Sequence, residues 1–230
     1  MKNLILIVAI MFFGCSIAHA GNQSKSTKES SMESNKNTNT ENVYIFLFNG
    51  FSDWEIAYLT PELRKNKKIA LKYFTIDGLE IISAGGFKIT PDLSIEELNP
   101  SEISVLILPG GTAWEENSIK GIDSLLDTLN SEKKTIGAIC SATTYLGQKG
   151  YLDGVKHTSN ALEYLQYISP NYKGEKKYQS DLAVTGGNIV TANGIAPIEF
   201  AREIFRKINL NSEKEIEKWF QLFKNGIWTK

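Results

Sequence analysis

The chain has 230 residues, of which 42% are hydrophobic and 10% aromatic, enough for the core of one ordinary α/β domain but not of two. Its 25 Lys and Arg residues nearly balance 26 Asp and Glu residues, and no long basic run occurs, which argues against nucleic acid or an anionic membrane surface as the partner. The composition favours a small, weakly charged ligand.

The first 20 residues have the pattern of an export signal. Lys2 gives a positive start, residues 4–13 an apolar stretch, and Ala18-His19-Ala20 a small-x-small cleavage site. The apolar stretch is shorter than the roughly 20 residues that a membrane helix needs. We therefore expect removal after Ala20 and an exported protein, periplasmic or secreted.

An alternative tethers the mature chain to a membrane. Phe13-Gly14-Cys15 is a loose lipoprotein box in which Cys15 would carry the lipid. With cleavage after Ala20 instead, the mature chain keeps one cysteine, Cys140, and one histidine, His157. An intramolecular disulfide is then impossible and a zinc site of Cys and His is disfavoured, so we expect no metal and no cofactor.

Residues 21–42 form a polar segment before the domain. Ser, Asn, Thr, Lys, Glu, Gln and Gly make up almost all of it, and Met32 is its one large apolar residue. Such a segment cannot offset its ordering entropy by burial. We expect a disordered linker over 21–42 and a folded domain over 43–230.

Strand and helix patterns alternate through this domain. Short continuous apolar runs rich in β-formers are typical of strands covered on both faces, which indicates a parallel sheet. The expected strands are 43–48, 71–76, 105–108, 135–139, 182–184 and 188–191, and the expected helices are 53–65, 122–129, 142–152, 161–168 and 197–208, with a local β-excursion over 79–95. This order predicts an α/β fold with a doubly wound, mostly parallel sheet.

A last helix is expected from Ser212. Ser212 and Glu215 have the spacing of a capping box. An apolar stripe follows at helical spacing, formed by Ile216, Trp219, Phe220 and Phe223. We expect the stripe to pack on the sheet, with a dimer contact as the alternative.

Cys140 follows an expected buried strand and precedes an expected helix. Ala138 and Ala142 flank it, and a nucleophile elbow needs small residues there because its strained turn brings neighbouring backbone close. The start of a helix favours the thiolate, so we expect a pKa well below the ordinary value of about 8.5. The alternative is a buried cysteine that packs as a small apolar side chain.

Pro109-Gly110-Gly111 ends the strand 105–108, at the sheet edge where open α/β folds bind ligands. Amides of this glycine pair, together with the Ser141 amide, would face a developing oxyanion. The alternative is a plain turn.

Glu55 follows the first strand in the stretch GFSDWE. As a structural residue, it would complete a capping box with Ser52. As a functional residue, it is a carboxyl group at the same sheet edge as Cys140, and a nearby thiolate would raise its pKa and keep it protonated as a hydrogen-bond donor.

His157 and Asn160 lie shortly after the helix that follows Cys140. Asn160 and Glu163 together form a good helix start, which would make Asn160 an N-cap. In an extended segment, residues three apart point to opposite faces, so His157 and Asn160 cannot both reach the same sulfur.

Four pieces of the sequence together resemble the ThiJ/PfpI family, the group that contains the Parkinson's-associated deglycase and the PfpI intracellular proteases, within the class I glutamine-amidotransferase-like superfamily. They are GFSDWE, the LPGG strand end, the AIC elbow and NIVTANGIAPIEFA, in this order between residues 43 and 208.

The resemblance implies a flavodoxin-like three-layer α/β/α sandwich, usually dimeric. It implies Cys140 as the nucleophile, Glu55 as its protonated partner, and the amides of Gly111 and Ser141 as oxyanion donors. Many members carry a histidine after the elbow helix where this chain has Asn160, with His157 three residues earlier. No histidine follows His157, so glutamine amidotransferase activity is disfavoured.

Three functions remain open at this point. The first is a Cys140-dependent hydrolase or glyoxalase-type enzyme acting on a small carbonyl, acyl or amide compound. The second is a non-enzymatic, redox-responsive or protective protein in which Cys140 is oxidised. The third is a small-ligand binding module with an inert elbow.

Overall fold

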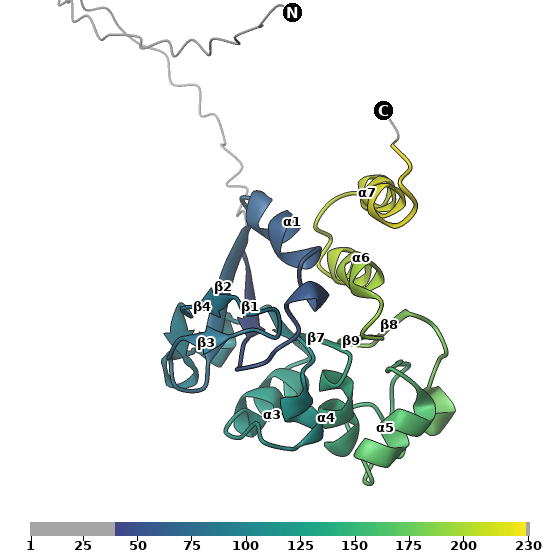
Figure 1. The fold of residues 1–230 in the computed structure, drawn as a ribbon. Coiled ribbons are helices and arrows are strands. Elements are labelled where there is room, and N and C mark those ends of the chain that lie inside the picture. The colour runs from purple at the N-terminus through teal and green to yellow at the C-terminus, as the bar shows by residue number, and fades with distance from the viewer. Residues whose placement is uncertain (1–39, 229–230) are drawn as a thin grey trace, which may run out of the picture. The chain divides into compact units, whose positions relative to one another are not determined.

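A seven-stranded sheet organises residues 40–228, the part of the chain that this computed structural model describes (Figure 1). Outside these residues lie the predicted signal sequence with its cleavage after Ala20, the alternative lipid attachment at Cys15, and nearly all of the predicted linker. The first strand begins at Glu41, so Glu41 and Asn42 belong to the folded domain and not to the linker.

The strands follow the order β5-β2-β1-β6-β7-β9-β8, and all neighbours are parallel except β8 and β9. The short strands β3 and β4 form a separate antiparallel pair, where the β-excursion was predicted. The strand bounds are β1 Glu41–Phe46, β2 Ile69–Thr75, β3 Ile81–Ile82, β4 Lys88–Ile89, β5 Leu93–Ser94, β6 Val105–Leu108, β7 Thr135–Ile139, β8 Ala183–Gly186 and β9 Ile189–Ala192.

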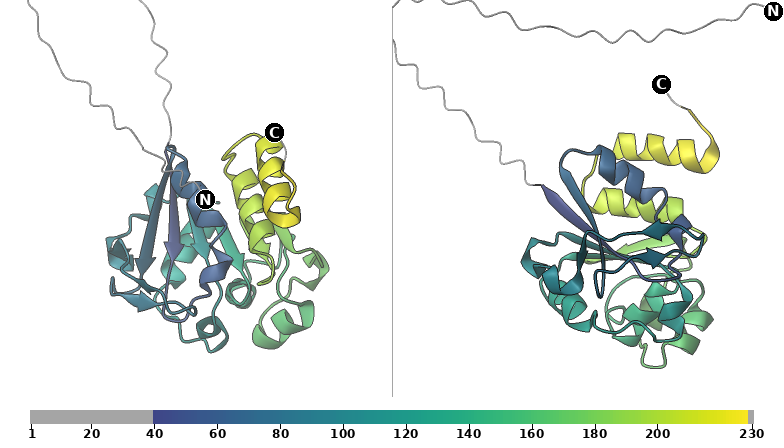
Figure 2. Two further views of the ribbon diagram at one scale, coloured as in Figure 1. Left: turned by 45° about the horizontal axis from the view of Figure 1, so that its top comes forward. Right: turned by 60° about the vertical axis from the view of Figure 1, so that its left-hand side comes forward.

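Helices cover both faces of the sheet, which confirms the flavodoxin-like three-layer architecture (Figures 1 and 2). Helices α1, α6 and α7 lie on one face, and α2, α3, α4 and α5 on the other. Their bounds are α1 Leu59–Lys65, α2 Thr112–Glu115, α3 Asp123–Ser131, α4 Ala142–Gln148, α5 Leu162–Ile168, α6 Pro197–Lys207 and α7 Glu213–Asn225, with 3-10 turns at Asp53–Glu55, Ile95–Glu97, Pro100–Glu102 and Glu175–Lys177.

The continuous apolar run of β1 serves two cores. Val43 and Ile45 belong to the core on the α1 and α6 side, whereas Tyr44 and Phe46 belong to the core on the α3 and α4 side. Successive side chains of a strand point to opposite faces. The buried part of β1, residues 43–46, therefore contains only apolar and aromatic side chains, as the sequence predicted, whereas Glu41 and Asn42 at its start are only partly buried.

The predicted helix over 53–65 is wrong in its first half. Asp53–Glu55 forms a single 3-10 turn, and α1 begins at Leu59. Pro61 explains the break, because a proline is tolerated in the first turn of a helix but not in its interior. The earlier turn is held at the sheet edge, where the Ser52 amide donates to Gly110 O at 2.9 Å.

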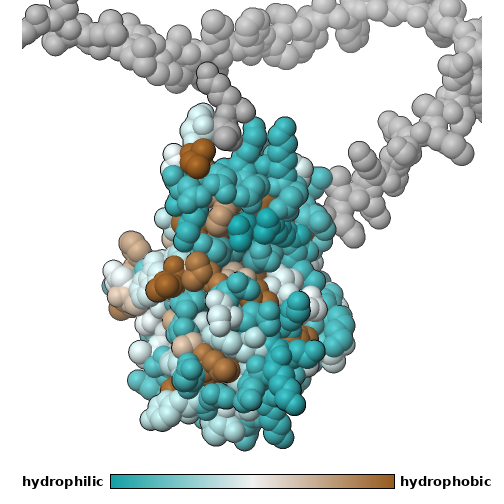
Figure 3. Space-filling view, turned by 90° about the vertical axis from the view of Figure 1, so that its right-hand side faces the viewer, coloured by the Kyte–Doolittle hydropathy of each residue, from teal (hydrophilic) through white to brown (hydrophobic). Residues whose placement is uncertain are grey.

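Helix α7 packs against other helices rather than directly on the sheet. Ser212 and Glu215 form the predicted capping box, the Trp219 ring lies 4.8 Å from that of Phe205 on α6, and Phe223 contacts Tyr58 at the start of α1. Figure 3 shows the surface on the right-hand side of the view in Figure 1, and this surface is mostly hydrophilic with small separate hydrophobic patches. Among residues 40–228, none of the helices has the length and apolar character needed to cross a bilayer.

Candidate active site

Four neighbouring parallel strands bring the predicted site residues to one edge of the sheet. β1, β6, β7 and β9 are adjacent, so their carboxyl ends meet at the same edge. The segments that follow these strands carry Glu55, Gly110, Cys140 and Gly194 in that order. Residues far apart in sequence are therefore neighbours around one cysteine.

Cys140 lies on a sharp turn between β7 and α4. Its φ of 59° is in the left-handed region that residues other than glycine rarely adopt. Its amide donates to Ala192 O on β9 at 2.9 Å, while its small neighbours Ala138 and Ala142 are fully buried. Cys140 itself is partly exposed. Strained backbone of this kind concentrates at functional sites.

Two buried hydroxyl groups hold this turn in place. Thr143 Oγ1 donates to the carbonyl of Cys140 at 2.5 Å and lies 2.7 Å from Ser159 Oγ. A hydroxyl has only one proton to donate, so Ser159 is the donor in the second contact. This chain of hydrogen bonds links the turn to the segment that carries Asn160.

Replacing Thr143 with valine is expected to destabilise the protein by about 1–3 kcal/mol, because the Cys140 carbonyl and the Ser159 hydroxyl both lose a buried partner. Urea unfolding measures the loss. Thr143→Ser keeps the hydroxyl and is the matched control, for which we expect a smaller loss. Equal losses in the two variants would show that the hydroxyl does not hold the turn.

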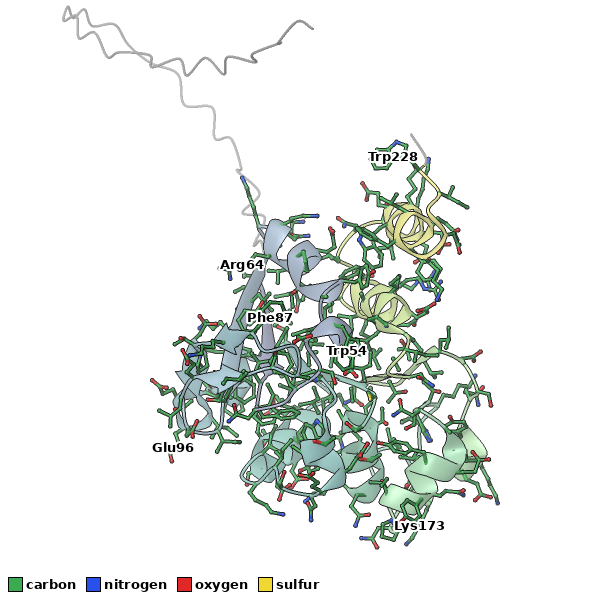
Figure 4. All side chains as sticks on the ribbon, in the orientation of Figure 1. Trp54, Arg64, Phe87, Glu96, Lys173 and Trp228 are labelled. Atoms are coloured by element: carbon green, nitrogen blue, oxygen red, sulfur yellow. The ribbon has the colours of Figure 1, made fainter. Side chains whose placement is uncertain are left out.

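Glu55 is buried at the end of its 3-10 turn. Its neighbour Trp54, labelled in Figure 4, is exposed. The Glu55 side chain is fully buried, and its Oε2 accepts from the Gly110 amide at 2.6 Å. Oε1 is buried without a well-formed hydrogen bond, and the carboxyl interacts with the side chains of Cys140 and Ser52. The predicted capping box of Ser52 and Glu55 does not form, because the carboxyl binds the neighbouring strand end instead.

Glu55 and Cys140 interact so closely that they titrate as a pair. Burial raises the pKa of the Glu55 carboxyl to about 7. Burial and the negative charge of Glu55 raise the pKa of the Cys140 thiol to about 11, and they outweigh the lowering by Asn160 and the Ser141 amide. The low thiol pKa expected from the helix start is therefore wrong. The pair therefore loses one proton near neutral pH and the second only at strongly basic pH.

Two glycines leave room for the sulfur and the carboxyl. A Cβ at Gly194 would lie 2.7 Å from Cys140 Sγ, and a Cβ at Gly110 would lie 2.7 Å from Cys140 Cβ and 2.8 Å from Glu55 Oε2. Such distances are much shorter than van der Waals contact. The site geometry therefore requires glycine at both positions.

Asn160 contacts the sulfur directly. Its Nδ2 donates to Cys140 Sγ at 3.4 Å, and its Oδ1 accepts from the Gly194 amide at 2.9 Å. The interpretation of Asn160 as a helix cap is wrong, because α5 begins at Leu162 after Ala161 and has no side-chain cap. The side chain instead bridges the end of β7, through Cys140, and the end of β9, through Gly194.

His157 points elsewhere and is fully buried. Its Nδ1 lies 2.8 Å from Val155 O, and its Nε2 lies 2.6 Å from the hydroxyl of Tyr172. Burial lowers the pKa of His157, which favours the neutral ring. The prediction that His157 and Asn160 cannot both reach the sulfur is thus confirmed, and the structure brings only Asn160 to it.

The two predicted oxyanion donors differ in their surroundings. The Gly111 amide donates to Ser141 Oγ at 2.8 Å, and that hydroxyl donates back to Gly111 O at 2.8 Å. The Gly111 amide is therefore already used by the protein, which argues against its predicted role. The Ser141 amide interacts with the side chain of Cys140 and remains a donor next to the sulfur.

Tyr164 and Glu115 were not predicted as site residues. The Tyr164 hydroxyl donates to Glu115 Oε1 at 2.6 Å, and Tyr164 lies close enough to Asn160 and Cys140 to interact with both electrostatically. Tyr164 lies in an ordinary helical pattern, and Glu115 lies on the short helix α2 that the sequence did not predict. Neither position carried a sequence signal.

A hollow of about 340 Å³ borders the site. Asn160 and Asn193 line it together with the segment around Tyr178 and the start of α5. Among residues 40–228, no group of three or more His, Cys, Asp or Glu side chains is arranged to hold a metal ion.

Sequence comparison identifies the family of the protein. Residues 41–207 match the model of the DJ-1/PfpI family. The chain belongs to this family. This confirms the resemblance to the ThiJ/PfpI family that the four sequence pieces indicated. An uncharacterized protease of Bacillus subtilis, YoaZ, is 40% identical over 192 residues, covering 80% of this chain and 91% of its own.

Other members of the DJ-1/PfpI family share the fold and parts of the sequence. A DJ-1 superfamily protein from Agrobacterium tumefaciens is 35% identical with a TM-score of 0.75, covering 81% of this chain and 98% of that one. A deglycase of Pyrococcus abyssi is 31% identical over 119 residues, covering 51% of this chain and 70% of its own. Relatives within the family are thus named both protease and deglycase.

Proposed function

We propose that this protein is a cysteine-dependent hydrolase or glyoxalase-type enzyme acting on small carbonyl, acyl or amide compounds. One observation carries the proposal: the fully buried carboxyl of Glu55 interacts with Cys140, a partly exposed cysteine on a strained turn. The DJ-1/PfpI relatives named protease and deglycase support it.

The proton that remains on the pair defines the first chemical step. When this proton is on Glu55, the Cys140 thiolate attacks the carbonyl carbon, a C–S bond forms, and the π electrons move to the carbonyl oxygen. Glu55 gives its proton to that oxygen and becomes a carboxylate, which leaves a neutral thiohemiacetal. The Ser141 amide and Asn160 Nδ2 are the donors that lie next to the sulfur.

An acyl or amide substrate follows the same attack with a different outcome. The tetrahedral adduct expels its leaving group, which takes up the proton, and a thioester with Cys140 remains. Water then hydrolyses the thioester and restores the thiol. Within residues 40–228, the groups that interact with Cys140 include no histidine. The proposed mechanism therefore has no proton transfer from Cys140 to a histidine, and ammonia transfer from glutamine stays disfavoured.

Turnover with and without the sulfur tests this proposal. Wild-type protein is expected to consume a small 2-oxoaldehyde such as methylglyoxal or to hydrolyse a small acyl ester, and Cys140→Ser is expected to lose that activity by about a thousandfold or more. Activity that survives in Cys140→Ser would remove Cys140 from the mechanism.

Oxidation of Cys140 is the second candidate function, in a redox-responsive or protective protein. The observation that favours it is the pair of donors at the sulfur, the Ser141 amide and Asn160 Nδ2, which fit the oxygens of an oxidised sulfur. The thiolate attacks a peroxide, an S–O bond forms as the O–O bond breaks, and the released hydroxide takes a proton from solvent and becomes water. A second peroxide oxidises the resulting sulfenic acid in the same way to the sulfinic acid. Wild-type protein that turns over none of these substrates but gains two oxygens on Cys140 would favour this candidate.

Location and assembly extend the proposal beyond the described residues. Export with removal of the signal after Ala20 rests on the sequence pattern, with a lipid tether at Cys15 as the alternative. A homodimer is what the family resemblance implies. A small-molecule ligand is proposed from the balanced charge of the chain and from the narrow space around the sulfur.

A further inference from the structure

The hairpin of β3 and β4 lies along the segment that carries Glu55. The Gly50 amide donates to Ile82 O at 2.8 Å, and the Ala84 amide donates to Phe51 O at 2.8 Å. The hairpin itself stands apart from the seven-stranded sheet. Backbone hydrogen bonds therefore attach it to the connection between β1 and Glu55.

Asp53 adds a side-chain anchor to this attachment. Its Oδ2 accepts from the Gly85 amide at 2.7 Å and from the Ser83 hydroxyl. Ser83 is buried, and its oxygen in turn accepts from the Phe87 amide at 3.1 Å. Hydrogen bonds to a carboxylate are stronger than those between neutral groups. The Asp53 side chain is thus firmly bound to the hairpin.

Gly85 leaves the space that the Asp53 carboxylate occupies. A Cβ at Gly85 would overlap Asp53 Oδ2 and lie 3.1 Å from Asp53 Cγ. A Cβ at the neighbouring Gly86, in contrast, would meet no atom within 4 Å. Any larger residue at position 85 would push the carboxylate away from its donors, so the close approach of Asp53 accounts for this glycine.

The turn that carries Glu55 depends on such cross-links because its own hydrogen bonds are long. The Glu55 amide donates to Ser52 O at 3.2 Å, and the Ile56 amide donates to Asp53 O at 3.4 Å, whereas N–H···O bonds cluster at about 2.9–3.0 Å. Gly110 holds the turn from the end of β6, through the Ser52 amide and the Glu55 carboxyl. The hairpin holds the same turn through Asp53.

We propose that Asp53 is a positioning residue: by tying the turn of Glu55 to the β3–β4 hairpin, it keeps the Glu55 carboxyl against Cys140. The inference rests on the proposed function, in which Glu55 gives a proton to the substrate oxygen. Asp53 acts through Glu55 and takes no part in bond formation. Loss of the anchor loosens the turn and lets the carboxyl move away from the sulfur.

The pH dependence of Cys140 alkylation by iodoacetamide tests this role without any need for turnover. In Asp53→Ala, the charge of Glu55 lies further from the thiol and the carboxyl gains access to water. We expect the alkylation rise near neutral pH to shrink and the rise in strong base to move down by about one pH unit or more. Asp53→Asn keeps an oxygen that can accept from both donors, so it should retain the wild-type profile.

Two hairpin variants repeat the test with Asp53 unchanged. Gly85→Ala pushes the Asp53 carboxylate aside and should change the profile as Asp53→Ala does, while Ser83→Ala removes one hydrogen bond and should change it less. Lys88→Ala alters an exposed residue of β4 and should leave the profile unchanged. Urea unfolding shows which variants fold, and if Asp53→Ala does not, Gly85→Ala and Ser83→Ala decide.

Turnover separates this inference from the proposed function. We expect Asp53→Ala to lower kcat for methylglyoxal by about tenfold and to change KM less than about twofold, because Glu55 acts in the chemical step and not in binding. A wild-type protein without turnover would refute the enzymatic proposal, and the alkylation profiles would still decide the role of Asp53.

Three results would overturn the inference. One is an unchanged profile in folded Asp53→Ala and Gly85→Ala, which would refute the inference alone where wild-type turnover requires Cys140. Another is an equal change in Asp53→Asn, which would show that the charge of Asp53 matters and its anchoring does not. The third is a single rise in the wild type, which would leave no pair for Asp53 to position.

Discussion

Replacing Gly194 with alanine is expected to abolish the reactivity of Cys140. The new Cβ would lie 2.7 Å from Sγ and 2.9 Å from Cys140 Cβ, so either the sulfur or the end of β9 has to move. The Asn160 side chain would also be displaced, because its Oδ1 binds the Gly194 amide. We expect the rate of Cys140 alkylation at neutral pH to fall by at least about a hundredfold, together with a loss of about 1–3 kcal/mol in stability from overpacking.

Gly154→Ala is the control for this substitution. Gly154 has no atom within 4 Å of the position that a Cβ would take. The substitution therefore measures the effect of replacing a glycine with alanine where the new methyl group contacts nothing. The alkylation rate should stay within about twofold of the wild type, because the change removes no contact of the site. A normal alkylation rate in folded Gly194→Ala would show that the space beside the sulfur is not needed.

The sequence predicted the sheet better than the local caps. The apolar runs at 105–108 and 135–139 coincide with β6 and β7 at both ends. A strand that is buried on both faces is a continuous apolar run in the sequence, so its ends can be recognised directly. The same capping pattern occurs at Ser212 and at Ser52, yet only Ser212 forms a capping box. The difference is tertiary: a surface helix start has no competing partner, whereas Glu55 binds a neighbouring strand end that the sequence does not reveal.

The candidate site was predictable where backbone geometry determines it. Cys140, Glu55 and Gly110 follow strands that a parallel sheet brings to one edge, and strand periodicity separated Asn160 from His157. Burial was not predictable to the same extent, and it reverses the expected direction of the Cys140 pKa. The contact of Tyr164 with Glu115 depends on how two helices pack, which no local pattern records.

Removal of the Glu55 charge is expected to change how the thiolate of Cys140 forms. In the wild type, the pair loses its first proton around pH 7 and the second around pH 11. Part of the thiolate forms in the first step, with the remaining proton on Glu55, and the rest forms in the second. In Glu55→Gln only the thiol titrates. Its pKa should lie between the two wild-type values, because the negative charge that raises it is gone while burial remains.

The rate of Cys140 alkylation by iodoacetamide, measured from pH 5 to 12 in wild type and in Glu55→Gln, tests the central claim that Cys140 and Glu55 act as one reactive pair. Cys140→Ser supplies the blank for background labelling. We predict two rises in the wild-type profile, one near neutral pH and one in strong base, and a single intermediate rise in Glu55→Gln. A single wild-type rise near the ordinary thiol value of about 8.5, unchanged in Glu55→Gln, would contradict the claim.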